Sequence, residues 1–316
     1  MERFAVGVDL GGTNLRVAAI DEKGKLVDQI SIPTHKEKGR DDVIDRLSSE
    51  ILRVAQRWAS SYSLAGIGVG IPGIINMKEG LLVMSPNLPG WENFNIRAQI
   101  SQRVNSPIFL ENDANAAALG EKWMGSGKDG NDLCFLTLGT GVGGGLILNG
   151  KIWHGKIGMA AELGHVTVYP EGRPCNCGNC GCLEAYASAT GVVRSAEELL
   201  DAGKASEGLK REAALQSQLN SAAIYRLAMA GDPSSVEIYQ GVGRALGIAI
   251  AGFINILDMD TFVLGGNAAD AWDAFANAMF EEVNKRSYIY ARDPRRILKS
   301  SLGNQAGIYG AACLAF

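Results

Sequence analysis

A strand, a glycine-rich turn and a returning strand occur twice along this chain, and this repeat restricts the possible folds most. The first copy spans residues 4–20 and turns at DLGGTN, residues 9–14. The second spans residues 133–148 and turns at GTGVGGG, residues 139–145. Helical periodicity follows each copy. We therefore expect an α/β architecture with two related lobes and a cleft between them.

The remaining elements are assigned from apolar periodicity and from glycine and proline punctuation. Strands are predicted over 25–32, 64–71, 108–110 and 262–264. Helices are predicted over 41–60, 114–124, 183–202, 215–230, 236–257 and 271–284, with a polar stretch near 203–208. The final segment, 306–314, is small and apolar and is expected to pack back on the first lobe. The longest apolar run, 245–257, is too short to cross a bilayer, so we expect no membrane partner.

Both glycine turns are candidate phosphate-binding loops. Adjacent glycines let backbone N–H groups approach an anion closely, and the Thr13 hydroxyl can donate a further hydrogen bond. Asp9 is placed to hold a Mg²⁺-bound water near a phosphate. The alternative is a pair of plain β-hairpin turns with glycine at positive φ. Two such loops in one chain together predict two arms that hold a triphosphate.

Two better-known nucleotide motifs are excluded. Residues 139–144 match GxGxxG in form, but that fingerprint opens a helix, whereas residues 146–148 continue as a strand before a turn at Asn149-Gly150. The P-loop pattern GxxxxGK[ST] occurs nowhere in the chain. The glycine loops therefore predict phosphate binding of another type.

A carboxylate follows the short strand that ends near residue 110. Asp113 stands directly before a predicted alanine-rich helix, where aspartate is a favoured N-cap. It can equally serve as a general base, because phosphoryl transfer to an alcohol needs a carboxylate within reach of the hydroxyl. Asn112 beside it is a candidate ligand for neighbouring hydroxyls. The residues alone support both readings of Asp113.

Four of the six cysteines lie within eight positions, at CNCGNCGC, residues 175–182, shortly after His165. Thiolates and imidazole are the ligands that structural Zn²⁺ prefers, and a closed tetrahedral site takes four of them. The residues leave five candidates: His165, Cys175, Cys177, Cys180 and Cys182. Glu162 and Glu184 bracket the cluster, which predicts a metal that shapes a binding pocket. His35 and His154 are better explained as lone surface or core histidines.

Composition narrows the setting. The chain has 316 residues and a formal net charge of −4, which argues against a nucleic-acid partner because such binding needs a basic face. The start, MERF, leads directly into a strand-like run and indicates no signal peptide. We therefore expect a cytoplasmic protein with reduced thiols.

The motifs DLGGT, ENDAN, LGTGVGGG, ELGH and CNCGNCGCLE resemble, in this order, those of the ROK family of repressors and sugar kinases. The resemblance covers essentially the whole chain. It implies a fold like actin and hexokinase (ribonuclease H-like), with two α/β lobes and the active site in the cleft between them. Residues 1–112 and 304–316 would form the small lobe, and 113–303 the large lobe with the zinc loop. ATP and Mg²⁺ would be cosubstrates, and a hexose the acceptor.

The resemblance also assigns site residues by position. Asp113 would be the catalytic base. The sugar ligands would be Gly73, Asn87, Asn112, Asp113, Glu162, His165 and Glu184. The ATP ligands would be Gly11, Gly12, Thr13, Asn14, Thr140, Gly141, Gly265 and Gly266. The structural Zn²⁺ would bind His165, Cys175, Cys177 and Cys182, which leaves Cys180 spare, and His165 would offer its second nitrogen to a sugar hydroxyl.

The segment SPNLPGW, residues 85–91, resembles the glucokinase branch of the family. The expected function is therefore ATP-dependent phosphorylation of the 6-hydroxyl of glucose. The main alternative is a kinase for fructose, mannose, N-acetylmannosamine or allose. A sugar-sensing repressor is a remote alternative, because those proteins carry a helix-turn-helix before DLGGT and Asp9 lies close to the start. The family also leads us to expect a homodimer.

Overall fold

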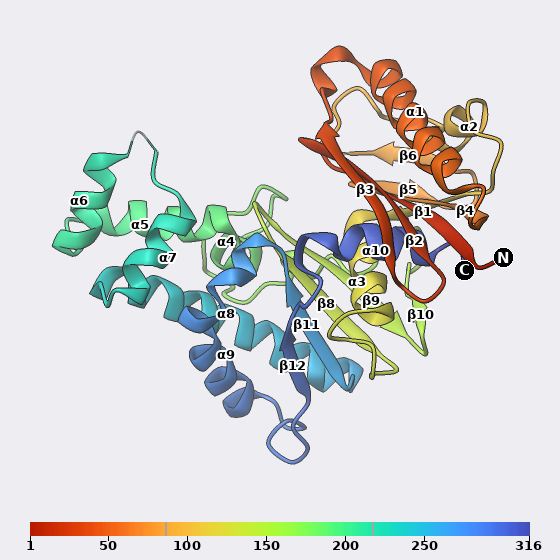
Figure 1. The fold of residues 1–316 in the computed structure, drawn as a ribbon. Coiled ribbons are helices and arrows are strands. Elements are labelled where there is room, and N and C mark those ends of the chain that lie inside the picture. Colours follow the sequence, from red (N-terminus) through yellow and green to blue (C-terminus); the bar gives the residue numbers. More distant parts are fainter. Residues whose placement is uncertain (86, 217) are drawn as a thin grey trace. The chain divides into compact units, whose positions relative to one another are not determined.

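The structure, a computed structural model, describes residues 1–85, 87–216 and 218–316. The chain forms two compact units, which are described separately (Figure 1). Unit 1 comprises Met1–Phe135, Gly145–Ala161 and Ser300–Phe316, and unit 2 comprises Leu136–Gly144 and Glu162–Lys299. The lobe boundaries expected from the sequence stay a prediction.

A five-stranded sheet forms the centre of unit 1, in the order β3-β2-β1-β4-β7. Its strands are β1 (Arg3–Leu10), β2 (Asn14–Asp21), β3 (Leu26–Pro33), β4 (Ser63–Ile71) and β7 (Ile108–Asn112). The first three strands run antiparallel, and β4 and β7 run parallel to β1. A small hairpin, β5 (Ile74–Asn76) with β6 (Leu81–Met84), stands apart from this sheet and was not predicted.

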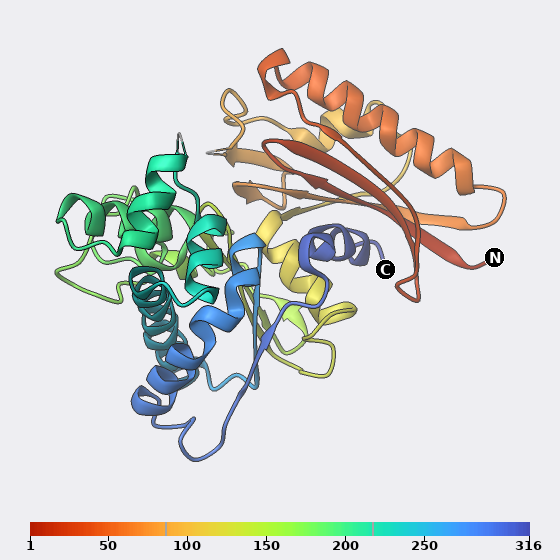
Figure 2. The same cartoon turned by 60° about the vertical axis from the view of Figure 1, so that its left-hand side comes forward.

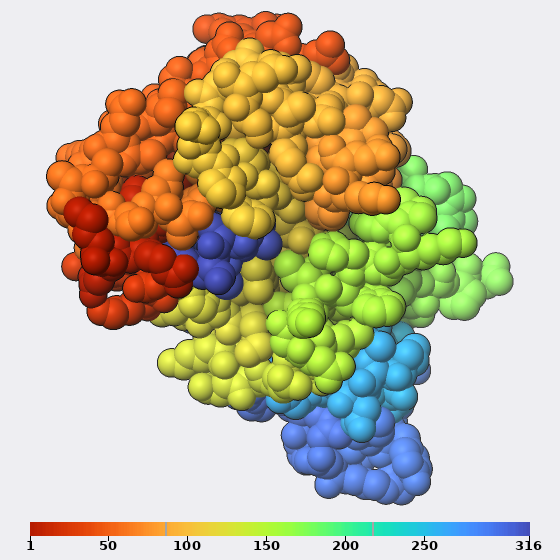
Figure 3. Space-filling view, turned by 90° about the vertical axis from the view of Figure 1, so that its right-hand side faces the viewer, coloured from red at the N-terminus to blue at the C-terminus, as the bar shows by residue number. Residues whose placement is uncertain are grey.

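Alternate residues of β1 serve the two faces of this sheet, as the period of two requires. Phe4, Val6 and Val8 are buried in the core that includes α1 (Arg40–Trp58). Ala5 joins a second core with Ile308 on α10 (Ala306–Cys313). The predicted packing of the C-terminal segment on the first strands is therefore confirmed, and Figure 3 shows this segment in blue between red N-terminal and yellow residues.

Two glycines permit the close approach of α10. A Cβ at Gly68 on β4 would lie 1.7 Å from the carbonyl oxygen of Ala311. A Cβ at Gly310 would lie 1.6 Å from the carbonyl oxygen of Ala116 on α3 (Asp113–Trp123). No side chain fits at these distances, so the helix rests directly on backbone, and α10 and α3 lie together in Figure 2. Unit 1 also contains α2 (Ile96–Ser101) and the 3₁₀ helices Lys36–Lys38 and Gly303–Gln305.

The second five-stranded sheet has the order β10-β9-β8-β11-β12. Its strands are β8 (Leu133–Leu138), β9 (Val142–Leu148), β10 (Lys151–Ile152), β11 (Thr261–Gly265) and β12 (Arg296–Lys299). The prediction that β9 begins at Leu146 is wrong, because Gly143–Gly145 already belong to the strand. Glycines carry no apolar strand signal, and Gly145 is needed because a Cβ there would lie 2.7 Å from the Cβ of Ala118.

The helices of unit 2 are α4 (Glu184–Ala187), α5 (Ala189–Asp201), α6 (Glu207–Leu215), α7 (Ser221–Met229), α8 (Pro233–Leu257) and α9 (Trp272–Arg286), with 3₁₀ helices at Leu163–His165 and Asn267–Ala271. The helix predicted over 183–202 is divided at Ser188, whose hydroxyl accepts the N–H of Gly191 as an N-cap. The helix predicted over 215–230 begins at Ser221, and Ser217 within that range lies outside the described residues.

The long buried helix predicted over 236–257 is confirmed as α8. Asp232 caps it by accepting the N–H of Ser235 at 3.0 Å, and Pro233 opens it. Among the described residues, α8 is the one helix long and apolar enough to cross a membrane by length and composition. It packs against α7 and α9 within unit 2, which accounts for its apolar character. The helix α6 and the strand β12 were missed from the sequence.

Candidate active site

The junction of β7 and α3 in unit 1 holds Asn112 and Asp113. Asn112 is the N-cap of α3, and its side-chain oxygen accepts the N–H groups of Ala114 (2.9 Å) and Asn115 (3.2 Å). Asp113 is the first helical residue and is half-buried, with one oxygen 3.0 Å from the N–H of Ala114. The capping role is thus filled by Asn112, and the helix N-terminus stabilises the negative charge of Asp113.

The same asparagine ties this junction to a predicted sugar-side turn. The Asn112 amide donates to the carbonyl oxygen of Gly73 at 3.1 Å. Gly73 adopts a φ of 125°, and a Cβ there would lie 2.3 Å from the carbonyl oxygen of Met84, so glycine is required. Gly73, Asn112 and Asp113 are therefore neighbours in unit 1.

Asp9 is the residue before the last of β1 and pairs with Arg16 across the β1–β2 ladder, with 3.3 Å between carboxylate and guanidinium. Burial raises the pKa of Asp9 to about 6, Arg16 opposes that rise, and the charge of Asp113 adds to it. Two neighbouring carboxylates whose negative charges repel each other form a favourable environment for a divalent cation.

The first glycine turn is held at its base and open at its tip. The N–H of Gly11 donates to the carbonyl oxygen of Asn14 at 2.9 Å, and the Thr34 hydroxyl donates to that of Gly11 at 2.7 Å. Thr13 and Asn14 are exposed. This leaves the tip free to contact a ligand.

Asn87 lies against this turn. A Cβ at Gly12 would lie 3.2 Å from the carbonyl oxygen of Asn87, and Lys36 donates to that oxygen at 3.4 Å. Leu88 and Trp91 are fully buried and anchor the segment, whereas Asn87 is exposed. Lys36 was missed from the sequence, because one exposed lysine in a polar stretch carries no pattern. Pro86 of the same motif lies outside the described residues.

A second pair of residues supports the β7–α3 junction from within. Nε2 of His154 lies 2.7 Å from Oε2 of Glu111, a buried carboxylate that also accepts the Asn115 amide at 3.1 Å. The hydrogen bond to Glu111 raises the pKa of His154. The expectation of a lone histidine is therefore wrong: His154 is paired, with a residue 43 positions away.

In unit 2, four of the five candidate metal ligands converge. Ligand atoms of His165, Cys175, Cys177 and Cys182 all lie within 4.8 Å of one another. Cys180 is exposed and outside this group. Burial raises the pKa of Cys182 to about 12, so a cation is needed to hold that sulfur as thiolate at neutral pH. Three sulfurs and one imidazole nitrogen suit tetrahedral Zn²⁺.

The two ring nitrogens of His165 face different residues. Nδ1 lies 3.7 Å from the Cys175 sulfur, and Nε2 lies 4.0 Å from a carboxylate oxygen of Glu162. A metal on Nδ1 would leave Nε2 free to act beside Glu162. The dual role expected for His165 stays a prediction.

Glu184 connects the cysteine loop to the second glycine turn. Its Oε2 accepts the N–H of Val142 at 2.9 Å, and a Cβ at Gly141 would lie 2.4 Å from the same oxygen. The turn is also fixed by the start of α5, where the Thr190 hydroxyl donates to the carbonyl oxygen of Thr140 at 2.8 Å. The structure therefore brings predicted phosphate and sugar residues of unit 2 together.

A cavity of about 390 Å³ opens beside this turn. Gly139 and Thr140 line one side, and Asn267 lines another. Gly265 ends β11, and Gly266 has a φ of 82° with no room for a Cβ, which would lie 2.3 Å from the carbonyl oxygen of Leu138. Tyr225, Tyr239 and Asp270 also line the cavity and were missed, because they come from helices whose faces the sequence does not orient.

The model of the ROK family matches residues 5–316. The glucokinase of Halalkalibacterium halodurans is 36% identical over 99% of this chain and 95% of its own length, and that of Thermotoga maritima 37% over 98% and 96%. A xylose repressor of Caldicellulosiruptor bescii is 30% identical over 98% of this chain and 77% of its own length. The crystal structure of a Streptomyces griseus ROK glucokinase with glucose and AMPPNP has a TM-score of 0.80 at 30% identity, with 98% of both chains covered.

Proposed function

The chain belongs to the ROK family and is an ATP-dependent hexokinase, and from this premise we propose that it converts glucose to glucose 6-phosphate with Asp113 as the general base. The actin/hexokinase-like fold expected from the sequence is confirmed by the relatives. The observation that carries the proposal is the β7–α3 junction. Asn112 caps the helix there, which places the carboxylate of Asp113 on the first helical residue, directly beside a predicted sugar ligand.

The proposed reaction needs a base, a held acceptor and a held donor. Asp113 would take the proton of the sugar 6-hydroxyl as the hydroxyl oxygen attacks the γ-phosphorus of ATP, while the bond from that phosphorus to the β,γ-bridging oxygen breaks and ADP leaves. Asn112, Gly73 and Asn87 from unit 1, and Glu162, His165 and Glu184 from unit 2, would bind the acceptor hydroxyls. Carboxylates suit this task because they accept hydrogen bonds from hydroxyl groups.

The donor would be held by the two glycine turns and the cavity beside the second turn. Gly11, Gly12, Thr13 and Asn14, together with Thr140 and Gly141, would contact the phosphates. The cavity next to Gly265 and Gly266 has the size and the aromatic lining of a small-molecule site and would take the adenosine. Mg²⁺ would neutralise phosphate charge beside Asp9.

Zinc would be structural in this scheme. His165, Cys175, Cys177 and Cys182 would close its four positions, which leaves none for a substrate. Bound there, the ion would fix the ring of His165 and the loop that ends at Glu184, and so set the positions of two sugar ligands. The reaction itself would not involve the zinc.

Glucose is favoured because the glucokinases of H. halodurans and T. maritima are more similar to this chain than the C. bescii xylose repressor is, and because one solved relative holds glucose. The alternative acceptors are fructose, mannose, N-acetylmannosamine and allose. A coupled assay of ADP release across these five sugars tests the proposal. We expect the highest kcat/KM with glucose, and a higher value with another sugar would replace glucose as the acceptor.

A repressor is the second class to test, since a xylose repressor shares about 30% identity with this chain. The net charge of −4 does not favour nucleic-acid binding. Sugar-dependent binding to operator DNA in a mobility-shift assay would support the repressor instead. We also propose that the protein is a cytoplasmic homodimer. Light scattering, which measures the mass of the particle in solution, tests the dimer.

A further inference from the structure

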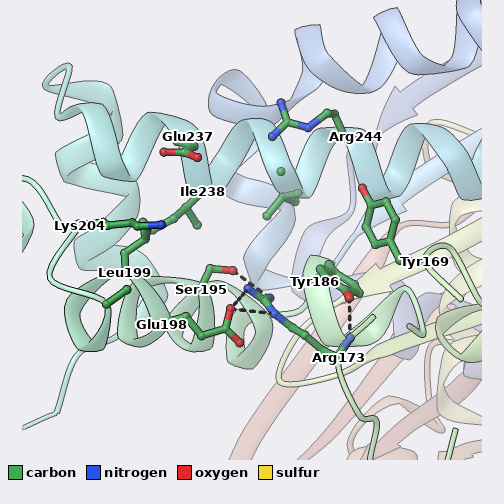
Figure 4. Close-up of a pocket in the computed structure, with 13 residues that line it drawn as sticks. Tyr169, Arg173, Tyr186, Ser195, Glu198, Leu199, Lys204, Glu237, Ile238 and Arg244 are labelled. Atoms are coloured by element: carbon green, nitrogen blue, oxygen red, sulfur yellow. Dashed lines mark hydrogen bonds and ion pairs between the residues drawn. The ribbon is translucent and has the colours of Figure 1, made fainter. Parts of the chain in front are cut away.

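Unit 2 holds a second cavity, of about 410 Å³, outside every residue assigned above to sugar, ATP or zinc (Figure 4). Its lining comes from the segment after His165, which contributes Tyr169 and Arg173, from Tyr186 on α4, from α5 and the loop after it, and from α8. Its volume lies within the range of small-molecule sites, about 300–1,000 Å³. No step of the proposed reaction uses it.

Arg173 lines this cavity, and hydrogen bonds hold its side chain in place. Its guanidinium donates to Glu198 (3.1 Å from Nε), to the Ser195 hydroxyl (3.0 Å) and to the carbonyl oxygen of Ala185 (3.1 Å). It also stacks over the ring of Tyr186 at 4.8 Å, as the dashed lines and rings in Figure 4 show. With these partners, Arg173 is already neutralised.

Two other cations in the lining have no such partners. Among the residues that the structure describes, neither Arg244 on α8 nor Lys204 before α6 makes a hydrogen bond or ion pair with its side chain. Figure 4 shows them at different sides of the cavity, Arg244 on the side of Tyr169 and Lys204 beside Leu199. Two carboxylates line the cavity. Glu198 forms ion pairs with Arg173 and Arg194, whereas Glu237 forms no ion pair or side-chain hydrogen bond with any described residue. The open charge in the cavity is therefore positive.

We propose that this cavity is a binding site for a small phosphate monoester. A phosphate dianion would pair with one of these cations, and the other, at a different side of the cavity, would add to the positive potential that attracts it. The organic part would lie against the edge-to-face pair of Tyr169 and Tyr186, whose ring centroids are 4.8 Å apart. Glu237 would accept a hydrogen bond from a hydroxyl of the ligand.

The occupied cavity would affect the sugar residues of the same unit through backbone. Arg173 accepts the N–H of Gly181 at 2.7 Å through its carbonyl oxygen and donates to the carbonyl oxygen of Ala185. These two contacts hold the segment that contains Cys182 and Glu184. Ligand binding against Arg173 should therefore change the affinity for the sugar, and this second step rests on the proposed function.

The binding step is tested by calorimetric titration of the full chain with glycerol 3-phosphate. Magnesium-AMPPNP and glucose are kept saturating, so that the probe does not enter the reaction site. We expect binding by the wild type and a loss of affinity of about tenfold or more in R244Q/K204Q. The matched control R211Q, an exposed cation on α6 outside the cavity, should bind as the wild type does. Absence of binding at millimolar probe, or equal binding by the double variant, overturns the proposal.

The coupling step is measured separately, as the calorimetric affinity for glucose with and without the probe. A changed affinity in the wild type and none in R244Q/K204Q supports the coupling. An unchanged affinity in both overturns it and leaves the binding site standing. Failure to bind glucose at all, with probe binding intact, counts against the proposed acceptor and not against the phosphate site.

Discussion

Nε2 of His154 lies 2.7 Å from Oε2 of Glu111, and this contact joins the segment after β10 to the residue two positions before Asp113. Glu111 is buried, and its other oxygen accepts the N–H of Asn112 and the amide of Asn115. A buried carboxylate needs such partners to remain charged. The pair thus supports the junction on which the proposed general base stands.

The stability of the protein should depend on the charge of His154. Glu111 raises the pKa of His154 above its usual 6.5, so protonated histidine is favoured in the folded state. The contribution of the pair is fully present below pH about 6.5 and is lost as the pH rises through the folded pKa. In urea unfolding, the free energy of unfolding of His154→Gln should therefore fall furthest below that of the wild type at pH 5.5. At pH 9 the two values should be nearly equal.

His35→Gln is the control for this measurement, because His35 pairs with an exposed glutamate, Glu37, and exposed pairs contribute little. It should differ from the wild type by the same small amount at each pH. If the difference in free energy of unfolding between His154→Gln and the wild type stays constant with pH, the charge of His154 does not contribute to stability.

Asp9 should lower the stability of the protein while serving its activity. Burial raises its pKa from 3.8 to about 6, so the folded state keeps a proton that the unfolded chain has lost between these values. Stability therefore falls as the pH rises from about 4 to 6 and stays lower above that. Asp9→Asn should increase the free energy of unfolding in EDTA at pH 7.5, by at most about 3 kcal/mol.

The same variant should lose most of its Mg²⁺-dependent turnover, which steady-state assays at varied Mg²⁺ measure. Its opposite effects on stability and activity distinguish a functional carboxylate from a structural one. A variant that is less stable at pH 7.5 and fully active would show that Asp9 acts only as a partner of Arg16.

Asp113→Asn should abolish turnover and preserve sugar binding. The amide keeps the size of the side chain and cannot accept the hydroxyl proton, so kcat should fall by about 10²–10⁴. Calorimetry should give a glucose affinity within a few-fold of the wild type. Asp129→Asn, at an exposed aspartate of the same unit, is the matched control. Near-normal kcat in Asp113→Asn would overturn the base assignment.

The sequence was most informative where one local pattern carries the signal. Apolar periodicity located α1 and α8, and the glycine pairs located both turns. It misplaced elements where local signals overlap: the N-cap at Ser188 interrupts a continuous apolar pattern, and three glycines concealed the first half of β9. Helix caps and glycine contacts are decided by neighbours that the periodicity does not contain.

Parts of the candidate site could not be found from the sequence for a related reason. The Glu111–His154 pair spans 43 positions, and Lys36 reaches Asn87 from 51 positions away. A single histidine or lysine at such a separation has no spacing to detect. The cysteine loop is the opposite case, because its four converging ligands lie within 18 positions and the chain itself limits their separation.

Lys36 should contribute to the binding of ATP. Its ammonium would lie 3.7 Å from a Cβ at Gly12, so it is next to the first phosphate turn. A cation there would stabilise the phosphate groups of the donor. Lys36→Gln should raise the KM for ATP about tenfold or more with little change in the KM for glucose. Lys38→Gln is the control two residues away. A rise confined to the KM for glucose would place Lys36 at the sugar, beside Asn87.

Loss of the zinc site should weaken sugar binding more than it affects the donor. Cys177→Ser removes one of the four converging sulfur and nitrogen ligands, so metal content by atomic absorption should fall to a small fraction of one per chain. Without the ion, His165 and the loop that ends at Glu184 lose their common anchor, and the KM for glucose should rise by about tenfold or more. The chain supplies its own control, since Cys180 is outside the ligand group: Cys180→Ser should retain both metal and KM. If Cys177→Ser lacks the metal but keeps the wild-type KM for glucose, the cysteine loop does not contribute to sugar binding.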